Sequence, residues 1–89
     1  MRIRLAMVAC YGPHDGPWLR ARGNEVGIRV RCLGIGEYVS VEYQNESPQL
    51  TSILLSNEGD FPIPTPFKRI RFRKLGGAKP TSVEILVDG

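Results

Sequence analysis

The sequence predicts an all-β fold: a single small β-sandwich or flattened barrel of six or seven mostly antiparallel strands. Three observations favour this class. No window of eleven residues keeps a helical apolar spacing without a Gly or Pro interrupting it. Ten glycines and seven prolines divide the 89 residues into short segments. Most of these segments alternate apolar and polar residues with the period of two that is typical of half-buried strands.

The chain is expected to form one domain, residues 1–89, because its length is that of a single small domain. A domain of this size buries only about 60–65% of the surface that its unfolded chain exposes, so its hydrophobic core is thin. A thin core usually needs support from a disulfide, a metal ion or a neighbouring subunit.

The two cysteines, Cys10 and Cys32, do not resemble a metal site, because the sequence has neither Cys-x-x-Cys nor a cysteine–histidine cluster. No metal and no other cofactor is expected. Cys10 shares strand parity with the outward Arg2 and Arg4, whereas Cys32 shares it with the inward Val30. The Cβ atoms of a disulfide must approach each other, so two free thiols in a reducing compartment are favoured over a bridge. A neighbouring subunit remains, and a homo-oligomer is predicted.

The first expected strand covers residues 2–10, with Ile3 and Leu5 on its inward face. Residues 11–18 contain Gly-Pro twice with Asp-Gly between, which predicts a loop. The chain is then expected to run extended from Trp18 until Gly23 and Asn24 turn it.

Two further strands are expected in the middle of the chain, residues 26–33 and 37–43, separated by a tight turn at the glycines of residues 34–36. In the first of them the alternation places Arg29 and Arg31 outward. Residues 50–56 form the next, less regular strand.

The last third is expected to begin with an extended segment over residues 59–66, at an edge of the sheet or outside it, because three prolines remove ladder donors there. Residues 67–75 and 83–87 form the final two strands. Taken together, the inward positions predict the core. It comprises Ile3, Leu5, Val26, Ile28, Val30, Val39, Val41, Ile53, Ile70, Phe72, Val83, Ile85 and Val87.

The net charge is +3, and the arginines recur in groups spaced by two residues, which puts each group on one face of a strand. The groups are Arg2 and Arg4; Arg20 and Arg22; Arg29 and Arg31; and Arg69, Arg71 and Arg73. Acidic residues lie in or beside other apolar-rich segments, so cross-strand ion pairs are expected.

An enzymatic function is not expected. The one histidine, His14, lies beside Asp15 in the Gly-Pro loop, where no nucleophile is marked near it. No apolar run approaches the 18 residues of a membrane span, and Met1 is followed by alternating charge where a signal peptide would have an apolar segment.

The segment FKRIRFRKLGG is the clearest candidate for binding. In a strand, Arg69, Arg71 and Arg73 would stand about 6.6 Å apart and, with Lys74, could follow the phosphates of an extended single-stranded nucleic acid. Phe72 has the opposite parity, so this strand offers no aromatic on its arginine face. A solvated strand face whose arginines can meet an acidic protein surface is favoured, with nucleic-acid binding as the alternative.

Residues 34–89 carry the segment order IGEYVSVEYQNES, SNEGDFPIPTPFKRIRFRKLGG and KPTSVEILVDG. This order resembles that of small β-sandwich proteins of tailed bacteriophage virions, of the head decoration (cement) or short fibre type. The resemblance implies a structural protein without catalytic residues. It would bind the capsid or another virion protein, usually as an oligomer, in a particle assembled in the host cytoplasm.

Two loops are expected to dock partners. Residues 11–18 end at Trp18, and residues 59–66 contain Phe61; each joins prolines, which limit the entropy lost on docking, to a large aromatic anchor. The expected partner-binding residues are therefore Trp18, Phe61, Arg69, Arg71 and Arg73. For Trp18, the alternative is a place in the core.

Overall fold

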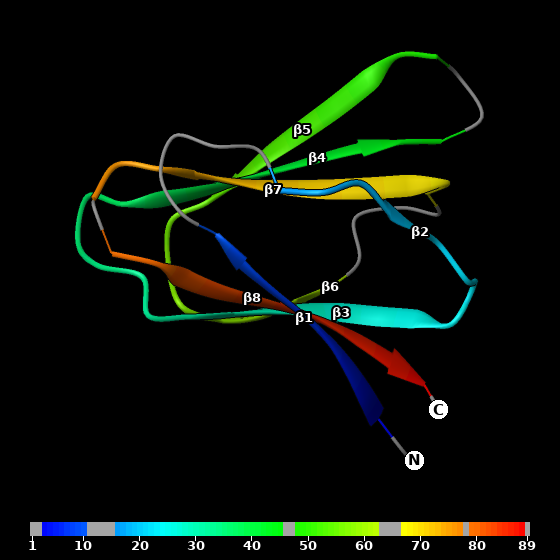
Figure 1. Cartoon of the computed structure of the whole chain (residues 1–89), viewed down its shortest axis with the longest axis horizontal. Helices are drawn as coiled ribbons and strands as arrows, with labels where there is room; N and C mark the ends of the chain where they lie inside the picture. The colour runs from blue at the N-terminus through cyan, green and yellow to red at the C-terminus, as the bar shows by residue number, and fades with distance from the viewer. Residues whose placement is uncertain (1–2, 11–15, 46–47, 63–66, 78, 89) are drawn as a thin grey trace.

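The computed structural model describes residues 3–10, 16–45, 48–62, 67–77 and 79–88, with the backbone alone for residues 3–10. The described residues form eight strands and no helix, which confirms the all-β class (Figure 1). Seven of the strands have four or more residues, and β2 has two. They are β1 (Ile3–Cys10), β2 (Leu19–Arg20), β3 (Glu25–Arg31), β4 (Tyr38–Gln44), β5 (Leu50–Leu55), β6 (Gly59–Pro62), β7 (Arg69–Leu75) and β8 (Thr81–Asp88).

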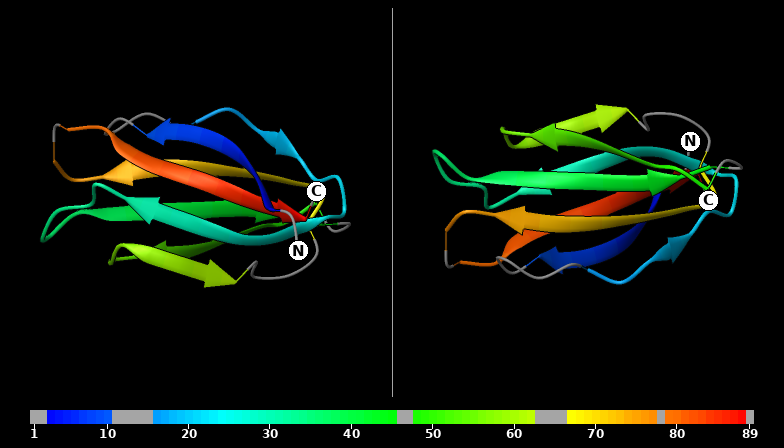
Figure 2. Two further views of the ribbon diagram at one scale, coloured as in Figure 1. Left: turned by 90° about the horizontal axis from the view of Figure 1, so that it is seen from below. Right: turned by 90° about the horizontal axis from the view of Figure 1, so that it is seen from above.

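The strands form two four-stranded sheets that lie face to face (Figure 1). One sheet has the order β1-β8-β3-β6 and the other the order β2-β7-β4-β5. Every neighbouring pair is antiparallel. Figure 2 shows each sheet in turn from its outer side.

The pairing follows one rule along the chain: β1 pairs with β8, β2 with β7, β3 with β6 and β4 with β5. The first half thus runs antiparallel to the second half like one long hairpin, which is rolled up so that its strand pairs fall alternately in the two sheets. This is the strand order of an eight-stranded jelly roll, an antiparallel architecture of two sheets and two Greek keys.

The core lies between the sheets and is built from the inward positions of five strands, β3, β4, β5, β7 and β8, with Phe67 added just before β7. Its buried residues are Ile28, Val30, Val39, Val41, Tyr43, Leu55, Phe67, Ile70, Phe72, Val83 and Ile85. Eight predicted core residues are confirmed as buried: Ile28, Val30, Val39, Val41, Ile70, Phe72, Val83 and Ile85. Ile53 and Val87 are partly buried and pack against this cluster. Ile3 and Leu5 belong to β1, for which the structure describes the backbone alone.

Two predicted inward positions of the expected strand 26–33 are wrong. The register of β3 against β8 shifts between Glu25 and Gly27, and this irregularity breaks the alternation, so Val26 is 44% exposed. Cys32 lies beyond the end of β3 with φ of 63° and is exposed. Its thiol is free, as expected. The side chain of Cys10 is not described.

The proline-rich segment behaves as expected where it is described. β6 is the edge strand beside β3, and Pro62 is its last residue, where a missing ladder donor is tolerated. The rest of that segment (residues 63–66) and residues 11–15 with His14 lie outside the described residues.

Candidate functional site

The outer surface of the sheet β2-β7-β4-β5 carries the predicted arginine row. Ile70 and Phe72 are fully buried, so the alternation of β7 turns Arg69, Arg71 and Arg73 to the outside, as predicted. We call this surface the arginine face.

The neighbouring strand β4 supplies polar partners to the row. Gln44 and Glu42 lie opposite Arg69 and Arg71 in the ladder. Arg69 Nε donates to Gln44 Oε1 at 2.7 Å, and Arg71 Nε donates to Glu42 Oε1 at 3.1 Å. The Arg71 and Glu42 side chains are only 23% and 19% exposed. The expectation of cross-strand ion pairs is thus confirmed on this face.

Trp18 lies on the same arginine face, next to the edge of β7 that pairs with β2 and not with β4. The chain before and within β2 runs along β7, with Gly16 N donating to Phe72 O at 2.7 Å and Leu19 opposite Ile70. The guanidinium carbons of Arg69 and Arg71 lie 4.2 Å and 4.5 Å from the centroid of the Trp18 ring, a cation–π arrangement. The indole is half-buried and is not part of the core cluster, so its alternative placement in the core is wrong.

Positive charge is concentrated at the β2 end of this face. Arg20 and Arg69 are directly opposite each other in the β2·β7 pair, and both are exposed. With Lys68 and Ala21 they line a shallow hollow of about 370 Å³. Like charges directly opposite in a ladder destabilise it, so an acidic partner group in this hollow would relieve the repulsion.

Two residues that were expected to bind partners or phosphates lie elsewhere. Phe61 is on β6 in the opposite sheet, partly buried and packed against the core. Lys74 is fully buried on the inward side of β7, where its Nζ donates to Glu37 Oε1 at 2.7 Å and to the carbonyl of Lys79 at 2.8 Å. The expectation that Lys74 extends the arginine row toward phosphates is therefore wrong.

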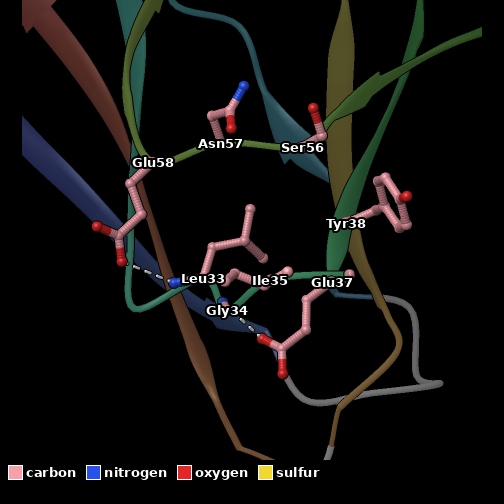
Figure 3. Close-up of a pocket in the computed structure, with 9 residues that line it drawn as sticks. Leu33, Gly34, Ile35, Glu37, Tyr38, Ser56, Asn57 and Glu58 are labelled. Atoms are coloured by element: carbon pink, nitrogen blue, oxygen red, sulfur yellow. Dashed lines mark hydrogen bonds between the residues drawn. The ribbon is translucent and has the colours of Figure 1, made fainter.

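The second surface is a hollow of about 450 Å³ at one end of the sandwich, between residues 33–38 and residues 56–58 (Figure 3). Ile35 is fully exposed in the turn beside it. The turn is closed by Glu37 N donating to Gly34 O at 3.2 Å, and Gly36 has φ of 79°, which a type II turn requires at its third residue.

Two carboxylates hold this loop in place. Leu33 N donates to Glu58 Oε1 and Gly34 N donates to Glu37 Oε1, both at 2.9 Å (Figure 3). The hydrogen bond from Lys74, followed by that from Gly34, keeps the pKa of Glu37 below its ordinary value, so this carboxyl stays ionised at neutral pH. The loop therefore presents Ile35 in a preorganised conformation.

Sequence reasoning missed this loop end and the place of Arg20. An isoleucine between two turn glycines cannot join the alternation of either flanking strand, and this signal could have marked Ile35 as exposed. The sequence shows Arg20 and Arg22 as a pair with a spacing of two, but no local pattern indicates that Arg20 lies opposite Arg69.

No protein-family model matches the chain, and no curated protein sequence matches it. In the part of the chain that the structure describes, no helix is long and apolar enough to cross a membrane. Nor do three or more His, Cys, Asp or Glu side chains gather there as a metal site.

Proposed function

We propose that the protein is a non-enzymatic structural protein of a bacteriophage virion, a capsid decoration or cement protein that binds the capsid or another virion protein as a homo-oligomer. The observation that carries the proposal is the jelly-roll pairing of β1 with β8 through to β4 with β5. Jelly rolls recur in viral capsid proteins, and also in lectins and cupins. This support is an analogy of fold, so the function has to be argued from the surface as well.

The arginine face suits an acidic protein partner. Of its outward strand residues, four are arginines (Arg20, Arg69, Arg71 and Arg73) and one, Glu42, is acidic. Tryptophan and arginine are the side chains most enriched among the energetically dominant residues of protein interfaces. Trp18 stacked with Arg69 and Arg71 combines both on a rigid sheet.

The direct test is the composition of purified particles of the phage that encodes the chain. Quantitative mass spectrometry should find the protein in a fixed ratio to the major capsid protein. In phages that carry the double variant Arg20→Glu/Arg69→Glu, incorporation should fall strongly. Val26→Glu is the control, because Val26 is half-exposed on the opposite sheet. Absence of the wild-type protein from the particles would overturn the proposal.

Binding of single-stranded nucleic acid is the second candidate, and the position of Trp18 favours it. The arginine row lacks an aromatic of its own, but Trp18 supplies a base-stacking platform beside Arg69 and Arg71. Four phosphate contacts from Arg20, Arg69, Arg71 and Arg73 would give a slope of log affinity against log salt of roughly −2.8.

Oligonucleotide titrations over a salt series separate the two candidates. If the first proposal is right, binding at physiological salt is weak and is unaffected by Arg71→Glu. A sub-micromolar complex with the steep slope, lost in Arg71→Glu, would replace the virion proposal with the second candidate.

A further inference from the structure

We propose that the free edge of β5 pairs with β5 of a second copy of the chain, antiparallel about a two-fold axis at Ser52. The two sheets that contain β5 then continue into one another across the dimer. The inference deepens the homo-oligomer part of the proposed function by naming the surface involved. The dimer is tested on the purified protein without a virion. The dimer proposal and the virion proposal can therefore be rejected independently of each other.

β5 lies at the end of its sheet, and among the described residues it pairs with β4 alone. In an antiparallel strand, every second residue turns its N–H and C=O groups away from the one neighbour, so an edge strand offers a row of groups that another strand can bond. The register against β4 runs from Val39 opposite Leu55 to Gln44 opposite Leu50 without a bulge. The edge is therefore regular over its whole length.

This edge carries none of the features that usually prevent strand addition. Natural edge strands are protected by short length, charged side chains, prolines or bulges. β2 has two residues, and β6 contains Asp60 and Pro62. β5 has six residues, LTSILL, with no charge and no proline. An edge of this kind is a template for pairing with a further strand.

Exposed apolar side chains lie along the same edge. Leu50 is 49% exposed and Leu54 is 56% exposed. They have the same parity as Ser52 and lie opposite Gln44 and Ser40 on the arginine-face side of β4. A strand added at the β5 edge would cover part of both leucines.

The sequence of β5 is complementary to itself, which identifies the partner as a second copy. In an antiparallel pairing centred on Ser52, Leu50 faces Leu54 of the other copy and Thr51 faces Ile53. Residues 48–56 (PQLTSILLS) contain no charged residue, so no charge meets its own copy near the axis. A two-fold contact is weakened when like charges face each other across the axis, and this segment has no charges that could do so.

The proposed dimer also joins the two arginine faces. Residues that oppose each other in a ladder lie on the same side of a sheet, so Ser52 and its copy place both arginine faces on one side. One dimer would thus present two basic, Trp18-bearing patches to an acidic lattice. Edge pairing alone buries less surface than a standard stable interface, so an equilibrium that depends on concentration is expected.

Sedimentation velocity over a wide concentration series tests the proposal. The wild type should pass from monomer to dimer. Leu50→Lys/Leu54→Lys places lysine opposite lysine twice across the axis and should raise the dissociation constant by about tenfold or more. Leu50→Glu/Leu54→Lys places a glutamate opposite a lysine of the other copy twice and should restore dimerisation. Val26→Lys is the control, because Val26 is also a half-exposed apolar residue, on the other sheet.

Melting temperatures of all variants serve as a check on folding. A wild type that stays monomeric at every concentration would overturn the proposal while leaving incorporation into virions open. Equal dimerisation of the two double variants, or loss of dimerisation in Val26→Lys, would overturn the pairing at Ser52.

Discussion

At the scale of single residues, Glu37 connects three parts of the chain. Its carboxylate accepts hydrogen bonds from Gly34 N at 2.9 Å and from the buried Lys74 at 2.7 Å, and it packs against Gly77. Lys74 in turn donates to the carbonyl of Lys79. A buried ammonium requires such partners, because an unpaired charge in the interior is strongly destabilising. The Glu37–Lys74 ion pair therefore links the loop that carries Ile35 to β7.

Gly77→Ala should destabilise the fold more than Gly23→Ala. Both glycines have positive φ, 71° and 90°, so each substitution introduces backbone strain of roughly 1–3 kcal/mol. At Gly77 the added Cβ would also collide with the Glu37 carboxylate, whereas at Gly23 no atom lies within 4 Å. Chemical denaturation of both variants measures the difference, which is the cost of displacing Glu37. Equal destabilisation would contradict the packing of Glu37 on Gly77.

The stability of the protein should decrease in acid through Glu37. Lys74 and Gly34 hold the pKa of Glu37 below its ordinary value of 4.5, and Arg29 lowers the pKa of Asp60 in the same direction. A carboxyl with a lowered pKa in the folded state stabilises the fold fully above its ordinary pKa and loses this contribution as the pH falls through the folded pKa. Urea unfolding should therefore show the loss beginning below about pH 5.

The variant Glu37→Gln identifies the group responsible. It should be less stable than the wild type at neutral pH, because Lys74 loses its charged partner. Its loss of stability in acid should be shallower than that of the wild type, because the carboxyl of Glu37 is absent. Part of the loss should remain, because Asp60 still titrates. An acid decrease as steep as that of the wild type would assign the effect to other carboxyls.

At the scale of the strands, β7 has one face in the core and one face on the outer surface of its sheet. Ile70 and Phe72 are fully buried, while Arg69 and Arg71 form the arginine face with Trp18. The cross-strand partners repeat this division, since Tyr43 opposite Ile70 is buried and Glu42 opposite Arg71 pairs with the guanidinium. Residues of one parity in β7 thus belong to the core, and those of the other parity form the arginine face.

Ile70→Asp and Arg71→Ser, one residue apart, should differ sharply in thermal stability. The aspartate would bury an unpaired charge at a cost of several kcal/mol, comparable with the whole stability of a small domain. Arg71→Ser removes a partly exposed ion pair and a stacking contact and should cost about 1 kcal/mol. Thermal melts followed by circular dichroism measure both. Similar melting temperatures would contradict the assignment of the two faces.

At the scale of the whole molecule, the jelly roll separates the two aromatic residues that the sequence suggested as docking anchors. Trp18 lies on the arginine face, and Phe61 lies on β6 of the other sheet, against the core. Trp18 and Phe61 therefore do not lie on one common surface. The arginine face and the β5 edge belong to the same sheet, so binding and self-association would occur side by side.

Trp18→Ala should reduce incorporation into virions with little change in melting temperature, because the indole lies outside the core cluster. Phe61→Ala should lower the melting temperature, because its ring packs against that cluster. The two variants are compared by differential scanning calorimetry and by mass spectrometry of particles. A large loss of stability in Trp18→Ala with normal incorporation would exclude Trp18 from the interface.

The fold class and most of the core can be predicted from the alternation of apolar and polar residues along the chain. The burial of Ile70 and Phe72 and the exposure of Arg69 follow from alternation within one strand, which needs no knowledge of any other segment. The same holds for the edge position of β6, because Pro62 cannot donate to a central ladder. Such features depend on neighbours in the chain, so they can be predicted from it.

Contacts between distant segments are visible only in the folded chain. The irregularity that exposes Val26 exists only relative to β8, and the buried Lys74 is satisfied by Glu37, which is 37 residues away. Trp18 reaches the arginine row only because β2 pairs with β7. The pairing of distant strands depends on the packing of the entire core and on loop closure. No local pattern encodes that choice, so the jelly-roll order, the arginine face and the exposed edge of β5 became visible only in the folded chain.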